Sequence, residues 1–126
     1  MAMCTRRLFL PRRTGKASNY AYGRAAEKKV GKAIKEELGG TYKRTTGSRG
    51  PYDVHNKTET GHVLTQVKAS RADAKTAPYV STKDQTKLII AAAEKHLKTG
   101  ETVTAATVLC KGGKIVQVEA LATFGA

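Results

Sequence analysis

The chain has few cysteines, few acidic residues and no long apolar run. Cys4 and Cys110 are its only thiols among 126 residues, which is too few for a disulfide framework and offers no paired metal motif. The apolar run at residues 8–10 is far too short for a secretory signal, and no segment approaches the roughly 20 apolar residues of a membrane helix. We therefore expect a soluble, intracellular protein without a membrane segment.

Basic residues greatly outnumber acidic ones. The 23 Lys and Arg against 10 Asp and Glu give a formal net charge of +13. Residues 1–26 carry six basic groups and no acid. A positive field of this size attracts polyanions, chiefly nucleic acid, with an anionic membrane surface as the other candidate. We interpret residues 1–18 as a basic arm with a short strand at residues 7–10, and residues 19–126 as one domain.

Periodicity and turn residues predict the element order αβββαββ, which is typical of an α/β sandwich rather than a helical bundle. Gly39 and Gly40 end the first helix, whose start Ser18 or Asn19 can cap, and Ser81 caps the second helix, which ends at Gly100. The predicted helices are residues 18–40 and 81–100, and the predicted strands are residues 41–45, 52–56, 62–69, 102–110 and 114–121.

Glu27 lies in the apolar stripe of the first predicted helix. Ile34 and Leu38 fall within about 20° of Glu27 around the helix axis, and Val30 borders the same stripe. A solvated glutamate is the common alternative, yet a carboxylate among apolar side chains needs a charged partner or a metal ion. The pattern favours a functional role for Glu27.

Three more polar side chains are expected near one another. In the strand at residues 62–69, Gln66 and Lys68 point to the same face. If the preceding hairpin closes at residues 57–61, Asp53 pairs close to Gln66. Taken separately, Asp53 suits a turn beside Gly-Pro, and the other two suit an exposed strand face.

Together with Glu27, these residues can surround one divalent ion. Mg²⁺ prefers oxygen ligands and keeps several waters, so the carboxylates of Glu27 and Asp53 with the amide oxygen of Gln66 suffice; Mn²⁺ is the alternative ion. Lys68 can offset the charge that develops on a phosphate. Such a site hydrolyses phosphodiesters.

The stretch YGRAAEKKVGKAIKEELGGTYKRTTGSRGPYDV, followed by GHVLTQVKASR, resembles the PD-(D/E)XK nuclease superfamily and, within it, the archaeal Holliday-junction resolvases. The helix STKDQTKLIIAAAEK matches as well, so the resemblance extends over residues 20 to about 120. It implies a restriction-endonuclease-like core, in which helices flank a mixed β-sheet, and a homodimer that cuts branched DNA. The chain's small size also fits a gene from an archaeal virus, which would place the protein in the host cytoplasm.

The resemblance assigns roles residue by residue. Glu27 and Asp53 would bind the metal and act in catalysis, Gln66 occupies the third ligand position, and Lys68 is the catalytic lysine. The sequence departs from the motif in two ways: Tyr52 separates Pro from Asp53, and a neutral amide replaces the third acid. The second departure predicts weaker metal binding.

Charge, the loop at residues 46–51 and the resemblance also indicate DNA-contacting residues. Three histidines, His55, His62 and His96, lack metal-ligand spacing and are interpreted as surface or strand residues. The apolar chain end at residues 120–126 is expected to pack against the core or a second subunit. The expected DNA contacts are Arg6, Arg7, Arg12, Arg13, Lys16, Arg24, Arg44, Ser48, Arg49 and Arg71.

The sequence therefore predicts a Mg²⁺-dependent, structure-selective DNA endonuclease. A non-catalytic nucleic-acid-binding protein with the same fold is the main alternative, because Gln66 weakens the ligand set. A basic RNA-binding or ribosome-associated domain is the third. Placement of Glu27, Asp53, Gln66 and Lys68 within reach of one metal ion discriminates between these alternatives.

Overall fold

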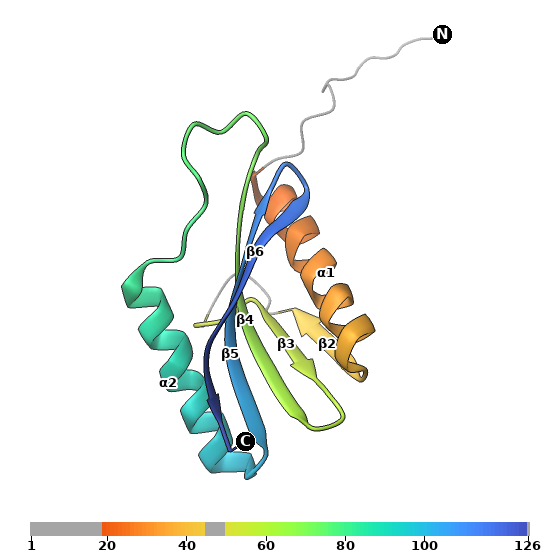
Figure 1. The fold of residues 1–126 in the computed structure, drawn as a ribbon, viewed down its shortest axis with the longest axis vertical. Coiled ribbons are helices and arrows are strands. Elements are labelled where there is room, and N and C mark those ends of the chain that lie inside the picture. The colour runs from red at the N-terminus through yellow and green to blue at the C-terminus, as the bar shows by residue number, and fades with distance from the viewer. Residues whose placement is uncertain (1–18, 45–49, 126) are drawn as a thin grey trace, which may run out of the picture.

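A computed structural model describes residues 19–44 and 50–125 (Figure 1). The predicted order αβββαββ is confirmed over these residues. The basic arm and the loop residues 45–49 lie outside the described part. The elements are α1 (Asn19–Leu38), β2 (Thr41–Arg44), β3 (Val54–Lys57), β4 (Gly61–Ser70), α2 (Thr82–Thr99), β5 (Thr102–Lys111) and β6 (Lys114–Phe124).

The five strands form one mixed sheet in the order β2-β3-β4-β5-β6. β2, β3 and β4 are antiparallel neighbours, β5 runs parallel to β4, and β6 returns antiparallel to β5. The parallel pair is joined through α2, since parallel neighbours require a crossover rather than a tight turn. The chain is thus an α/β protein, as predicted, with one helix on each face of the sheet (Figure 1).

Two apolar clusters hold the helices on the sheet. On one face, Val30 of α1 packs with strand residues that include Val67 and Val108. On the other face, Leu88 of α2 packs with Leu64 and its neighbours. Because adjacent residues of β4 alternate between faces, the even positions from Leu64 to Lys68 turn toward α2. This places Gln66 and Lys68 on the α2 side, together, as predicted.

The capping residues act as the sequence suggested. The Ser81 hydroxyl accepts a hydrogen bond of 3.1 Å from the Asp84 N–H at the start of α2. Gly100 ends the helix with φ 72°, and Gly39 follows α1 with φ 77°. A left-handed backbone at a helix end suits glycine because it has no Cβ. These caps fix where each helix stops and the next strand begins.

Three details differ from the prediction. β3 begins at Val54, so Asp53 precedes the strand, although its N–H still donates to the Thr65 carbonyl at 2.8 Å. Leu38, the last residue of α1, is 50% exposed, so the apolar stripe ends at Ile34. β6 continues to Phe124, which packs against the α2-side cluster and confirms core packing by the chain end.

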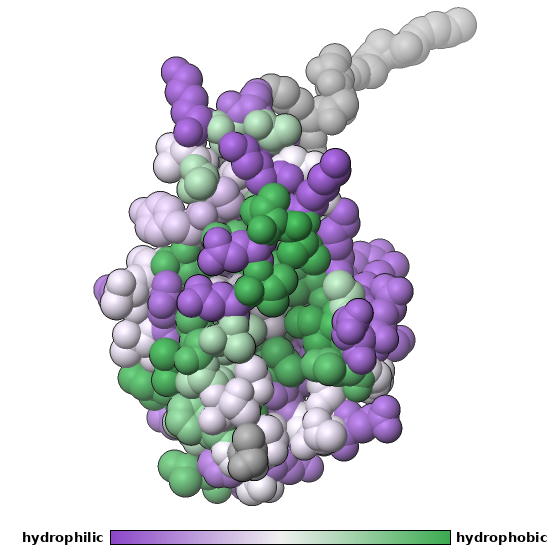
Figure 2. Space-filling model, in the orientation of Figure 1, coloured by the Kyte–Doolittle hydropathy of each residue, from purple (hydrophilic) through white to green (hydrophobic). Residues whose placement is uncertain are grey.

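β6 is an edge strand with apolar side chains in solvent. Val116 and Val118 are 56% and 66% exposed. Figure 2 shows apolar side chains gathered on this face of the molecule, with hydrophilic ones around them. An exposed edge strand of this length is open to pairing with another chain.

Neither described helix has the length and apolar character that would let it cross a bilayer.

Candidate functional site

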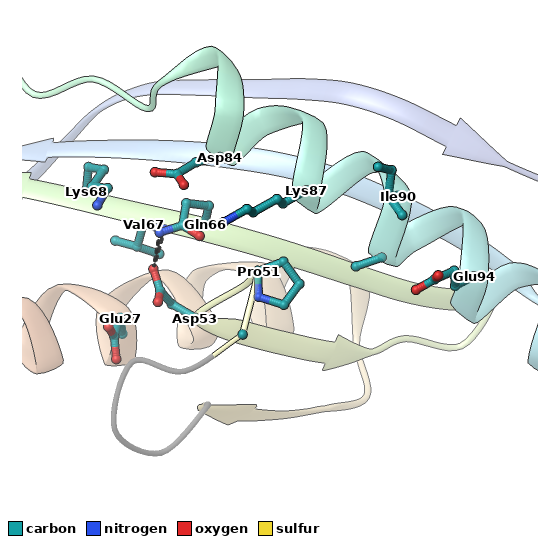
Figure 3. Close-up of a pocket in the computed structure, with 12 residues that line it drawn as sticks. Glu27, Pro51, Asp53, Gln66, Val67, Lys68, Asp84, Lys87, Ile90 and Glu94 are labelled. Atoms are coloured by element: carbon teal, nitrogen blue, oxygen red, sulfur yellow. Dashed lines mark hydrogen bonds between the residues drawn. The ribbon is translucent and has the colours of Figure 1, made fainter.

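One cavity of about 630 Å³ collects the four residues on which the sequence prediction depends. Glu27 comes from α1, Asp53 from the segment before β3, and Gln66 and Lys68 from β4. Figure 3 shows the space between α1, β4 and α2, with Glu27 on α1 and with Gln66 and Lys68 on β4. We call this space the cleft. One cavity therefore collects all four side chains, although Glu27 and Lys68 are 41 positions apart in the sequence.

Asp53 is held rigidly at the floor of the cleft. It is only 8% exposed. Its Oδ2 accepts hydrogen bonds from the Gln66 Nε2 at 3.0 Å and from the Val67 N–H at 2.9 Å. Both of these bonds end on the same oxygen, which leaves Oδ1 for another partner. The register of β3 on β4, with Val54 opposite Thr65, produces this contact.

Glu27 occupies the α1 side of the cleft. Its side chain is 13% exposed, and Arg44 of β2 places Nη1 4.0 Å from Oε1. The expectation that a carboxylate in the apolar stripe needs a partner is met in part by this arginine. The contact is long for an ion pair, so Glu27 retains capacity to bind a further cation.

Burial and a neighbouring acid raise the pKa of both carboxylates. Desolvation and the charge of Asp53 raise the pKa of Glu27. Desolvation also raises the pKa of Asp53, where the Val67 N–H and Lys68 oppose the shift and Asp84 adds to it. Asp53 thus disfavours the ionised form of Glu27, and Asp84 disfavours that of Asp53, so a cation bound among these acids would stabilise their ionised forms.

The donor set fits a hard divalent ion. Asp53 Oδ1, the Glu27 carboxylate and the Gln66 amide oxygen are all oxygen donors, as Mg²⁺ and Mn²⁺ prefer. Gln66 donates to Asp53 through nitrogen, which leaves its carbonyl oxygen available. Within residues 19–44 and 50–125, no group of three or more His, Cys, Asp or Glu side chains is placed to hold a metal ion. Water molecules would have to complete the coordination.

α2 forms a second wall of the cleft that the sequence prediction missed. Asp84, Lys87, Ile90 and Glu94 line it, and Figure 3 shows Asp84 and Lys87 reaching from the helix over β4. Asp84 also belongs to the capping turn of α2, where its N–H donates to the Ser81 hydroxyl. Positions 84, 87 and 94 lie on one face of a helix, and all three are charged. These three charges on one face were the available signal.

The expected DNA contacts divide into described and undescribed residues. Arg44 lies beside Glu27, Arg24 is exposed on α1, and Arg71 follows β4. The Arg71 guanidinium carbon lies 4.8 Å from the centroid of the Tyr22 ring. The remaining expected contacts lie outside the described residues: Arg6, Arg7, Arg12, Arg13, Lys16, Ser48 and Arg49.

The histidines form a network at the opposite end of the sheet. His62 is buried and bonds both the Glu101 carboxylate and, at 2.9 Å, the Nε2 of His55. His96 contacts the Glu101 carbonyl at 2.8 Å. Burial, with Lys95 as the next cause, lowers the pKa of His55 to about 4. Strand placement is right for His55 and His62, but the network ties β3, β4 and β5 together and was not predicted.

Comparisons with protein-family models, with curated proteins and with solved structures found no match. The functional interpretation of the cleft consequently depends on its own residues and geometry.

Proposed function

We propose that this protein is a metal-dependent DNA endonuclease that hydrolyses phosphodiesters, with Mg²⁺ or Mn²⁺ as the ion and branched DNA as the substrate. The observation that carries the proposal is the meeting of Glu27, Asp53, Gln66 and Lys68 in one cleft. Three separate parts of the chain supply these four side chains: α1, the segment before β3, and β4. A chance arrangement of polar surface residues would not be expected to bring these four side chains to one cavity.

Each side chain has a role that its position supports. Glu27 and Asp53 would hold the ion with Gln66, and Asp53 is oriented for this by its two hydrogen bonds on Oδ2. When bound, the ion would lower the pKa of a coordinated water and neutralise phosphate charge. Lys68 lines the same cleft, where its ammonium stabilises negative charge that develops on a phosphate oxygen. The overall charge of +13 supplies affinity for the DNA backbone.

The finer fold assignment belongs to the same proposal. A restriction-endonuclease-like core is supported by the mixed sheet between two helices and by Lys68 on the central strand β4, with Asp53 just before β3 and Glu27 on α1. A homodimer is supported by the exposed apolar residues of the β6 edge, Val116 and Val118. Dimerisation would let one assembly cut two strands of a junction symmetrically.

A non-catalytic nucleic-acid-binding protein is the second candidate, and one observation favours it. The amide of Gln66 already satisfies Asp53 through a hydrogen bond of 3.0 Å. This contact stabilises the metal-free cleft and supplies no negative charge to an ion. A protein that binds DNA without cutting would need no more than the basic surface.

Cleavage of a panel of end-labelled DNA structures tests the proposal. Junctions, flaps, single strands and plain duplex of one sequence are incubated with Mg²⁺, with Mn²⁺ or with EDTA. We expect cleavage of a branched substrate only with a divalent ion. Asp53→Asn should abolish it, while Glu59→Gln, at an exposed acid in the turn between β3 and β4, should not. DNA binding without cleavage under every condition would favour the second candidate.

A further inference from the structure

A second cavity, of about 420 Å³, adjoins the cleft. The two share Val67 and Lys68, so the groove continues past the proposed catalytic lysine. The start of α1 forms one wall of the second cavity, and the chain that follows β4 forms the other. Each cavity has the size of a site for one small ligand.

No described residue packs so closely against Gly23, on the α1 wall, that it would require a glycine at this helix position. Glycine is the least favourable helix residue after proline. At Gly31 the reason is clear, since a Cβ there would approach the Tyr42 ring to 2.4 Å. At Gly23 an added Cβ would meet no described atom within 4 Å. Gly23 lies one turn before Glu27 on the same helix face, so a side chain there would narrow the groove beside the cleft.

Arg71 places a positive charge at the same cavity. Its guanidinium lies over the ring of Tyr22, 4.8 Å from the centroid. The Tyr22 hydroxyl donates to the Ser70 carbonyl at 2.9 Å and accepts from the Gly113 N–H at 3.1 Å. The ring is thus fixed between α1, the end of β4 and the β5–β6 turn. Asp73 is the one acid among the residues that line this cavity.

We propose that this second cavity is a nucleotide subsite next to the scissile phosphate. It takes the adjoining nucleotide of the DNA strand, with Arg71 on its phosphate and Gly23 leaving room for its sugar. An arginine fork recognises a phosphate without reading sequence. The subsite depends on the proposed nucleic-acid function and extends its cleft on the side of Arg71.

A size series at Gly23 tests the open wall in the full-length protein. Gly23→Ala and Gly23→Leu should both raise the melting temperature by about 4 °C, because either residue favours the helix. Fluorescence anisotropy in EDTA then measures affinity for a labelled DNA junction. We expect Gly23→Leu to weaken binding about tenfold and Gly23→Ala to change it by less than about threefold. Equal affinities for both variants, or a lower melting temperature for Gly23→Leu because the chain itself fills the cavity, would overturn the subsite.

Two substitutions that each remove one positive charge test the phosphate contact. Arg71→Gln and Lys75→Gln each remove one positive charge from the segment between β4 and α2, and Lys75 is exposed. Arg71→Gln should weaken DNA binding about tenfold, because it removes a direct phosphate contact. Lys75→Gln should weaken it about twofold, because it only lowers the overall positive field of the protein. Equal losses would remove Arg71 from the subsite. A wild-type protein that binds no DNA would overturn the proposed function and the subsite together. Normal wild-type binding that neither series affects would overturn the subsite alone.

Discussion

Gln66→Glu is the substitution that most clearly separates a metal ligand from a structural amide. In the wild-type protein the Gln66 Nε2 donates to Asp53 Oδ2 at 3.0 Å. Glutamate removes this donor and places a third carboxylate against the first two. Two unit charges 4 Å apart repel by about 4 kcal/mol at an effective dielectric constant of 20. Rotation of the new side chain toward the open cleft relieves part of this, so we expect the metal-free variant to lose about 2 kcal/mol of unfolding free energy.

A bound cation should reduce the difference in stability between the two proteins. For a chain of this length, about 2 kcal/mol corresponds to a melting temperature about 8 °C lower in EDTA. With three carboxylates in the ligand set, Mg²⁺ should bind about tenfold more tightly. Under saturating Mg²⁺ the variant then gains about 1.4 kcal/mol more than the wild type, or about 5 °C more in melting temperature.

Thermal unfolding with and without Mg²⁺, together with calorimetric titration, measures both effects. Gln117→Glu is the matched control, because it makes the same substitution at an exposed position of the β6 edge. The control should show neither the loss in EDTA nor the larger gain with Mg²⁺. If Mg²⁺ shifted the melting temperatures of the wild type and of Gln66→Glu equally, Gln66 would not be a ligand.

Three further results are expected. Deleting residues 1–17, which removes five basic groups, should weaken DNA binding at all sequences and reduce the slope of log affinity against log salt by up to about 4; an unchanged slope would show that the arm makes no phosphate contacts. Because the pKa of Glu27 is raised above its usual 4.5, the folded metal-free protein holds that proton longer than the unfolded chain, so this group's contribution to stability falls as pH rises above about 4.5. Urea unfolding at pH 4 and pH 7 should accordingly show that the unfolding free energy falls less between these pH values for Glu27→Gln than for the wild type. Equal decreases for the two proteins would contradict the raised pKa. Leu64→Ala should cost about 2–5 kcal/mol in the same urea experiment because Leu64 is fully buried against α2, whereas Leu97→Ala, at a residue 83% exposed, should cost less than about 0.5 kcal/mol.

Local patterns in the sequence were sufficient for the order of elements and for the four central residues of the cleft. Alternation along β4 fixed the shared face of Gln66 and Lys68, and the short hairpin fixed their distance from Asp53. The helix ends followed from Ser81, Gly39 and Gly100, whose backbone requirements are local. These features depend on neighbours in the sequence, which is why reading the sequence alone recovers them.

The remaining features depend on contacts between distant elements. Asp84 and Lys87 line the cleft only because α2 crosses over β4, and no local pattern states how a helix is placed on a sheet. The bond between His62 and Glu101 joins β4 to the residue just before β5, and these two strands are neighbours only after the α2 crossover. For Leu38 the prediction was wrong in the other direction: helical periodicity predicted that this side chain is buried, but the sheet does not cover it.

Lys68→Ala tests the central claim most directly. The measurement compares single-turnover cleavage and EDTA binding of the preferred DNA for the wild type, Lys68→Ala and Lys75→Ala, which removes an exposed lysine outside both cavities. The wild type and Lys75→Ala should cut at similar rates. Lys68→Ala should cut at least about 100-fold more slowly while its affinity changes by less than about tenfold, because one cation among many adds little to binding but acts directly on the reacting phosphate. Cleavage by Lys68→Ala at the wild-type rate would contradict the proposed catalytic site.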